Sequence, residues 1–324
     1  MGLPTDILRF FNHQNALIVN DKVVPYSVGD FKRQNPQHPV SDIRNICQKF
    51  TNESLLIHTG IKDHPFTGDT YYNLSFSEHW ASYGVYDFII YGFLSIRNHF
   101  YSSVRPVVVQ NSNGDHDIGT CFVIGGNFVV TAFHCIESMK SIQIPDLSGS
   151  PVRTKKIWTS SDKSDIAVIE LEKNYFSATP AFQFNHGEIL DNVLTMGYPP
   201  ISGFDAIQFA EIATVNSNLK SSSGSIVGQD TSYLDGQDYM LINARVKGGN
   251  SGAPIINKRG AVVGMLVNIP TNPKDARQLD TLGYGVAIPS KALQQLFQDI
   301  NQKDAKVQEV KFENLEVGFK TFIE

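Results

Sequence analysis

The chain has 324 residues, more than one typical domain needs and too few for three. Its hydrophobic content of 41% and charged content of 18% are those of an ordinary globular protein and exclude a disordered one. The formal net charge is −5 and no long basic run occurs, so nucleic acid is not an expected partner.

The N-terminal residues 1–19 lack the basic region, apolar core and cleavage site of a secretory signal. Asp6 stands where a myristoylation motif has Ser or Thr, and no apolar run approaches the ~20 residues that cross a bilayer. We therefore expect a soluble, cytoplasmic protein with no membrane partner. A secreted protein whose signal has been removed is the alternative.

Residues 1–100 form the first predicted region, an accessory module of mixed α/β structure. The segment is rich in aromatic residues, with a helix-like pattern over 40–50 and a buried-looking run over 86–96. Its aromatic side chains are best explained as core. The segment contains no motif that assigns it a function.

Residues 101–302 form the second predicted region, which is mainly β. Short β-branched or aromatic runs recur between Gly, Asn, Asp, Ser and Pro, as expected for an all-β sandwich or barrel. The break at 125–127 predicts a tight hairpin. A helix capped by Ser290 follows the last strand, with apolar residues at helical spacing up to Ile300. The tail, residues 303–324, alternates weakly and could add a strand of undetermined position.

Three short segments of the second region carry chemistry. His134 follows an apolar strand in TAFHC, Asp165 opens a strand in SDIAVIEL, and Ser251 lies in the glycine-rich GGNSGAP. A serine hydroxyl needs an adjacent base, a histidine titrates near neutral pH, and a carboxylate on the other ring nitrogen fixes the tautomer. Asp162 competes with Asp165 for the last role, but the Ile-Ala-Val-Ile run after Asp165 favours Asp165.

These segments resemble the trypsin/chymotrypsin superfamily of serine peptidases, most closely its bacterial HtrA/Deg and glutamyl-endopeptidase branches. Residues 196–199, MGYP, and 283–289, GYGVAIP, match the superfamily in the same order. The resemblance covers about residues 104–300. It implies two six-stranded antiparallel β-barrels with a C-terminal helix, the first barrel carrying His134 and Asp165 and the second carrying Ser251.

The resemblance also implies roles for single residues. Ser251 is the expected nucleophile, His134 the base, Asp165 its partner, and the backbone amides of Gly249 and Ser251 the oxyanion hole. Asn250 stands where trypsin-type zymogens have an aspartate that pairs with a newly cut N-terminus, so activation by amine insertion is not expected. HtrA-type enzymes share this Asn but usually carry a C-terminal peptide-binding module, for which few residues remain here.

Substrate preference is the least determined expectation. The resemblance implies a pocket formed by Arg245, Leu266, Tyr284 and Gly285. An inward-pointing Arg245 would favour an acidic side chain before the scissile bond, whereas a differently built loop would leave Arg245 in solvent.

The three cysteines are too few for a disulfide framework, and no metal-binding spacing occurs, so no metal or cofactor is expected. Cys121 and Cys135 occupy positions where trypsin-like enzymes have a disulfide, but two buried thiols are the favoured interpretation in a reducing compartment. A His-Asp-rich hairpin turn is preferred over a metal site at Asp115, His116 and Asp117.

The sequence thus predicts a serine endopeptidase that acts on protein or peptide substrates and is regulated by its N-terminal module or by a partner protein. The main alternative is a catalytically inactive scaffold or binding module on the same fold. An esterase using the same residues ranks lower, since the Gly-x-Ser-x-Gly elbow of α/β-hydrolases is missing.

Overall fold

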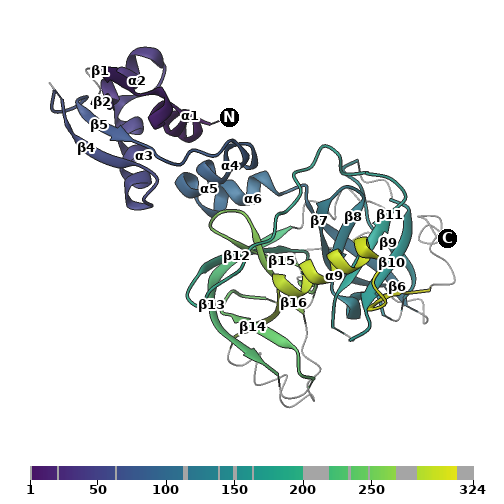
Figure 1. Cartoon of the computed structure of the whole chain (residues 1–324). Helices are drawn as coiled ribbons and strands as arrows, with labels where there is room; N and C mark the ends of the chain where they lie inside the picture. The colour runs from purple at the N-terminus through teal and green to yellow at the C-terminus, as the bar shows by residue number, and fades with distance from the viewer. Residues whose placement is uncertain are drawn as a thin grey trace. The chain divides into compact units, whose positions relative to one another are not determined.

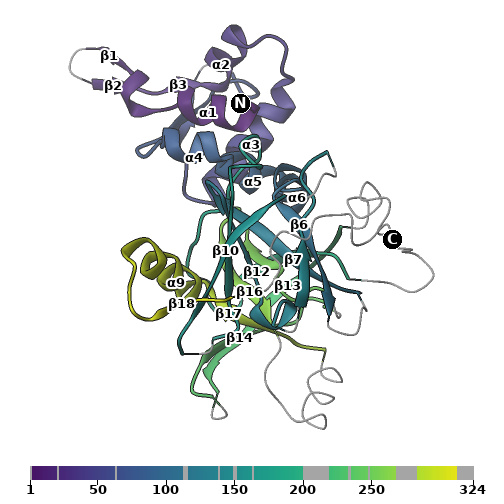
Figure 2. The same ribbon diagram turned by 90° about the vertical axis from the view of Figure 1, so that its right-hand side faces the viewer.

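The computed structural model divides into two compact units, Met1–Ser95 and Ile96–Glu324. It describes residues 2–19, 22–62, 64–111, 116–137, 139–148, 152–162, 164–199, 219–232, 235–246, 249–267 and 283–311. Figures 1 and 2 show helices and a small sheet in the first unit, and mostly strands in the second.

The first unit combines short helices with small sheets. Its elements are α1 (Leu3–Phe10), η1 (His13–Asn15), β1 (Leu17–Val19), β2 (Lys22–Val24), β3 (Tyr26–Ser27), α2 (Val28–Gln34), α3 (Val40–Asn52), β4 (Ile57–Ile61), β5 (Asp69–Tyr72), α4 (Glu78–Tyr83) and α5 (Val85–Tyr91). β1 and β2 form a hairpin, and β3, β5 and β4 form a three-stranded antiparallel sheet.

Local sequence explains where these helices begin and end. Ser27 and Asp30 form a reciprocal capping box at the start of α2. Gly92, at positive φ, ends α5, so the run over 86–96 is split between α5 and α6 (Phe93–His99). The boundary between the two units falls within α6.

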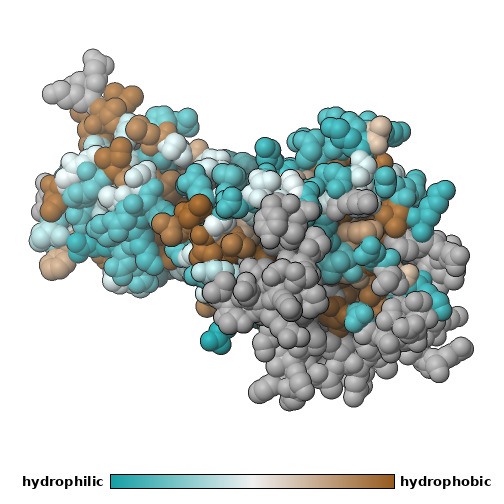
Figure 3. Space-filling model, turned by 90° about the horizontal axis from the view of Figure 1, so that it is seen from below, coloured by the Kyte–Doolittle hydropathy of each residue, from teal (hydrophilic) through white to brown (hydrophobic). Residues whose placement is uncertain are grey.

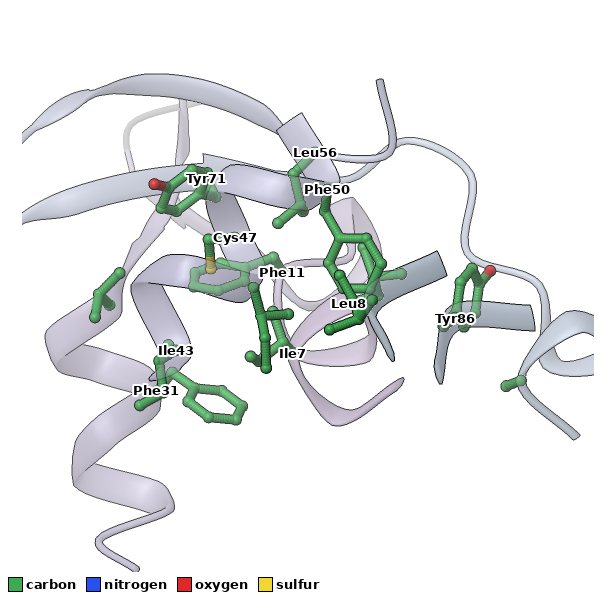
Figure 4. Close-up of a cluster of buried hydrophobic side chains, with 14 residues drawn as sticks. Ile7, Leu8, Phe11, Phe31, Ile43, Cys47, Phe50, Leu56, Tyr71 and Tyr86 are labelled. Atoms are coloured by element: carbon green, nitrogen blue, oxygen red, sulfur yellow. The ribbon is translucent and has the colours of Figure 1, made fainter. Parts of the chain in front are cut away.

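The core of the first unit is aromatic and fully buried. Phe11 and Tyr86 are 0–2% exposed and pack with the apolar face of α3, which includes the buried Phe50 (Figure 4). The outer strands differ, because Ile18 on β1, Val23 on β2 and Ile61 on β4 are at least half exposed. Figure 3 shows that hydrophobic residues gather in patches on the face of the molecule drawn there.

The second unit begins with a sheet of six consecutive strands plus one from the end of the chain. The strands are β6 (Val104–Asn111), β7 (His116–Gly125), β8 (Phe128–Thr131), β9 (Met139–Gln143), β10 (Thr154–Ser160), β11 (Ala167–Leu171) and β18 (Val307–Glu309). Their order is β18-β10-β11-β8-β7-β6-β9. The expected hairpin at 125–127 is present, with Gly125 and Gly126 at positive φ.

This sheet differs in detail from the expected first barrel. Over the described residues it is open, ending at β9 and β18, and it has seven strands because the tail folds back so that Trp158 on β10 pairs with Glu309. The weak alternation after residue 303 therefore does produce a strand.

A closed barrel follows, in which every strand is antiparallel to its neighbours. Its strands are β12 (Asn192–Gly197), β13 (Lys220–Thr231), β14 (Asp238–Ile242), β15 (Pro254–Asn257), β16 (Val262–Val267) and β17 (Gly285–Pro289). The order is β12-β13-β14-β17-β16-β15. Its interior is filled by buried apolar side chains such as Val193, Ile255 and Val263.

Helix α9 (Ser290–Gln302) contacts both halves of the second unit, touching β16 and β17 of the barrel and β10 and β18 of the sheet. Figure 1 shows it in yellow, running from the barrel toward the sheet. Ser290 does not cap it as predicted. Pro289 is the N-cap, and the Ser290 hydroxyl donates to the Asn185 carbonyl instead.

The mainly β architecture with a C-terminal helix and an N-terminal α/β region is therefore confirmed. No helix in the described part of the chain is long and apolar enough to span a bilayer.

Candidate active site

Strand pairing brings His134 and Asp165 to one end of the open sheet. β8 and β11 are antiparallel, with Thr131 opposite Ala167. His134 lies three residues after the end of β8, in the short 3-10 helix η2 (Phe133–Cys135), and Asp165 lies two residues before the start of β11. The end of one strand lies beside the start of the other, so the two side chains meet.

Asp165 holds both the backbone and the ring of His134. One carboxylate oxygen accepts the His134 backbone N–H at 2.7 Å, and the other lies 2.6 Å from the ring Nδ1. Because a carboxylate only accepts, Nδ1 is the protonated nitrogen and Nε2 is left for another partner. Asp162, the competing carboxylate, instead accepts the backbone N–H of Ser164 in the preceding turn.

Ser251 lies in the turn that precedes β15 of the barrel. Cys135 connects it to the histidine, since its Sγ is 3.8 Å from His134 Nε2 and 3.7 Å from the Ser251 carbonyl oxygen. The Ser251 carbonyl also accepts the Thr120 backbone N–H at 2.9 Å. The three residues singled out from the sequence are thus gathered where the sheet meets the barrel.

Gly252 permits this close approach. It has φ +83°, and a Cβ there would lie 2.0 Å from the Thr120 carbonyl oxygen and 2.5 Å from Thr131 Oγ1. Contacts this short exclude any side chain, and the backbone conformation itself favours glycine. Gly252 therefore lets the loop that carries Ser251 pack directly on β7 and β8.

The backbone around Gly249 is suited to binding an anion. Gly249 has φ +86°, and its carbonyl accepts from the Thr120 hydroxyl at 2.8 Å. That hydroxyl in turn accepts the Tyr198 backbone N–H at 3.0 Å. Within the described ranges, the N–H groups of Gly249 and Ser251 make no hydrogen bond, so both are available as donors.

Thr120 was not predicted from the sequence. It is fully buried and holds the serine loop through both its backbone N–H and its hydroxyl. The available signal was a hydroxyl residue just before the apolar run that begins at Cys121, which does not specify a partner 129 residues away.

The environment of His134 changes its protonation. Burial of the ring lowers the pKa of His134, but the hydrogen bond with Asp165 and the contact with the Cys135 sulfur outweigh this, and the net pKa lies above 6.5. The site therefore stabilises the imidazolium that forms when the ring accepts a proton.

The cysteines are all free thiols, as the sequence favoured. Cys121 is fully buried on β7, and this burial raises its pKa to about 12, so it remains a neutral thiol. Within the described ranges, no group of three or more His, Cys, Asp or Glu side chains could hold a metal ion. Residues 112–115, which carry most of the predicted His-Asp-rich turn, lie outside those ranges.

The expected substrate-pocket residues are only partly brought together. Arg245 and Tyr284 line a pocket of about 510 Å³ that also touches Asn250, next to Ser251. Leu266 and Gly285 are buried in β16 and β17 and are not among its described lining residues. Thr195 and Lys220, which the sequence did not single out, do line it.

Comparison with known families finds one match, which lies within the second unit. Residues 119–265 match the family described as trypsin-like peptidase domain. The match includes His134, Asp165 and Ser251. The resemblance stated from the sequence is confirmed over these residues.

Individual relatives belong to the HtrA/Deg group. A probable periplasmic serine endoprotease DegP-like of Rickettsia prowazekii is 28% identical over 196 residues, which are 59% of this chain and 34% of that protein. The serine protease Do-like HtrA of Lactobacillus helveticus is 24% identical over 204 residues, 63% of this chain and 44% of that protein. The chain thus spans about a third of the length of the first relative and under half of the second.

Solved structures of the same group are also similar. The HtrA-type protease AlgW with a tripeptide has 17% identity and a TM-score of 0.48, covering 65% of this chain and 64% of that one. The serine endoprotease from Yersinia pestis has 17% identity and a TM-score of 0.47, covering 66% of this chain and 68% of that one.

Proposed function

We propose that the second unit is a serine endopeptidase that cleaves protein substrates through an acyl-enzyme on Ser251. The observation that carries the proposal is the geometry around His134. Asp165 binds its Nδ1 at 2.6 Å, and Cys135 lies against both its Nε2 and the Ser251 carbonyl. The DegP-like and HtrA relatives, named as serine proteases, support the same activity.

The residues would act in a defined order. His134 Nε2 takes the proton of the Ser251 hydroxyl as Oγ forms a bond to the scissile carbonyl carbon. The oxyanion accepts from the N–H groups of Gly249 and Ser251, whose removal one at a time would lower kcat by about 10²–10³-fold. His134 then returns the proton to the departing amine as the C–N bond breaks, and a water molecule hydrolyses the ester by the reverse sequence.

The alternative of an inactive scaffold has less support. A binding module has no need for a carboxylate bonded to both the backbone N–H and the ring of one histidine, or for two backbone N–H groups beside a serine that have no partner among the described residues. Those features match the requirements of acyl transfer.

Hydrolysis of an unfolded protein tests the activity. We expect the full chain to cut β-casein into fragments detectable by mass spectrometry, and Ser251→Ala to lower the rate by about 10⁶-fold, to background. Ser148→Ala, an exposed turn residue, is the matched control and should retain the wild-type rate. Equal cutting by wild type and Ser251→Ala would refute the assignment of the nucleophile.

We also propose that the first unit regulates the second. The support is that residues 1–95 form a compact unit with its own core, outside the segment that matches the peptidase family. A chain beginning at Ile96 should fold and should differ from the full chain at least ~5-fold in kcat/KM toward β-casein, since regulatory couplings are typically 1–3 kcal/mol. Equal rates across substrates, temperature and salt would contradict regulation by this unit.

A regulatory partner protein and a cytoplasmic location remain predictions. One relative described above is named periplasmic, which favours the alternative of a location outside the cytoplasm, and the other carries no compartment in its name. Fractionation of the source cells, with the protein followed by antibody, decides between these compartments.

A further inference from the structure

The pocket beside Asn250 is strongly basic. Its lining residues are Thr195, Pro199, Lys220, Ser221, Ser222, Arg245, Val246, Asn250, Gly283 and Tyr284. Two of these are cations, and no Asp or Glu occurs among the described lining residues. A third cation adjoins the pocket, since Arg97 Nε donates to the Ser221 hydroxyl at 3.1 Å. Positive charge therefore gathers along this pocket in a chain whose formal net charge is −5.

A buried hydroxyl without a partner lies in the same lining. Thr195 is 2% exposed, and its Oγ1 makes no hydrogen bond within the described part of the chain. On β12 it is two residues from Val193, which packs in the barrel core, so alternation turns Thr195 to the same inner face. A buried hydroxyl that makes no hydrogen bond is unfavourable, and a polar group entering the pocket would supply the missing hydrogen bond.

The neighbouring strand, β13, adds a second hydroxyl group beside that of Thr195. Ser222 on β13 is directly opposite Thr195, and directly opposed residues project from the same face of a sheet. On the other side, Gly285 lets Val246 approach, because a Cβ at Gly285 would lie 2.9 Å from Val246 Cγ2. The pocket therefore has an apolar wall, a hydroxyl-lined inner part and cationic groups.

We propose that this pocket binds an acidic side chain of the substrate, with its carboxylate held by Arg245, Lys220 and the Thr195 hydroxyl. The assignment rests on the proposed function, because the position of Asn250 next to Ser251 makes this the pocket for the residue beside the scissile bond. A carboxylate can accept hydrogen bonds from all three groups, and charge-assisted hydrogen bonds of this kind are roughly twice as strong as neutral ones. Arg245 is exposed and also lines the pocket.

Binding to an inactive protein tests the pocket separately from catalysis. The full chain with Ser251→Ala is immobilised and offered an equimolar mixture of decapeptides that differ only in one central residue: Glu, Gln, Asp, Asn or Leu. Mass spectrometry of the retained peptides gives the preference. We expect Glu to be retained at least ~10-fold over Gln at low salt, and the ratio to fall as ionic strength rises.

Three further variants in the same background identify the donors. Arg245→Gln and Lys220→Gln should each lower the Glu/Gln ratio at least ~5-fold, and Thr195→Val, which keeps the shape, should lower Glu retention. Arg153→Gln, which removes an exposed arginine just before β10 and outside the pocket, is the matched control and should leave the ratio unchanged.

Equal retention of Glu and Gln, or a Glu preference that persists in both Arg245→Gln and Lys220→Gln, would overturn the pocket assignment. Failure of the proposed function has a different signature. The wild-type chain would then leave β-casein intact, whatever the inactive protein binds.

Discussion

Replacing Asp165 with Asn is expected to lower kcat by about 10⁴-fold while leaving the fold intact. An amide in place of the carboxylate no longer favours protonation of Nδ1, which the 2.6 Å contact now enforces.

The pH dependence of Asp165→Asn should also differ from that of the wild type. The base must be neutral to act, so wild-type kcat/KM should rise with pH through a pKa above 6.5. Loss of the carboxylate removes the contribution that raises this pKa, so the rising limb should move to lower pH.

Asp162→Asn is the matched control for this variant. Asp162 is three residues away, and an asparagine there could still accept the Ser164 N–H. Its kcat and pH profile should stay within about twofold of wild type, the range of a neutral surface substitution. The triad assignment would be wrong if Asp162→Asn lost activity and Asp165→Asn kept it.

Among the glycines of the second unit whose surroundings are described, Gly252 should be the least tolerant of substitution by Ala. The new Cβ would lie 2.0 Å from the Thr120 carbonyl oxygen, and the residue would also have to keep φ near +83°. Overpacking and a left-handed backbone together should lower the free energy of unfolding by about 2–5 kcal/mol. Moving the serine loop away from β7 should also lower kcat at least ~10²-fold, since the oxyanion donors move with it.

Gly236→Ala separates the two causes. Gly236 has a similar φ of +73°, but no atom lies within 4 Å of an added Cβ, so only the backbone cost of about 1–2 kcal/mol applies. Urea unfolding followed by Trp158 fluorescence, in a Trp80→Phe background, reports the second unit alone, since the chain has two tryptophans. Similar losses in both glycine variants would contradict the role of close packing at Gly252.

The sequence predicted the fold class and the residues that meet at the site because these depend on local patterns. The short motifs around His134, Asp165 and Ser251 each place a reactive side chain near the end or start of a strand. The pairing of β8 with β11 then brings the His134 ring to the Asp165 carboxylate. Two glycines of GGNSGAP also have a local explanation, because Gly249 and Gly252 have a positive φ, which glycine adopts most readily.

Features that depend on register between distant strands could not be predicted. Lys220 and Thr195 share a pocket only because β12 and β13 pair with Thr195 opposite Ser222, and a shift of one residue would turn Thr195 away from the barrel interior. Thr120 reaches Gly249 across the junction of the sheet and the barrel. The tail strand β18 was uncertain for the same reason, because three residues with weak alternation do not specify their partner.

The central claim is that Ser251 is an activated nucleophile, and its covalent modification is the most direct measurement. The full chain is treated with a fluorophosphonate, and the adduct is located by mass spectrometry of the digested protein. We expect one adduct, on Ser251, that is absent after denaturation and absent in His134→Ala. An adduct on another serine, or none on Ser251 in a folded chain that cleaves protein, would contradict the assignment.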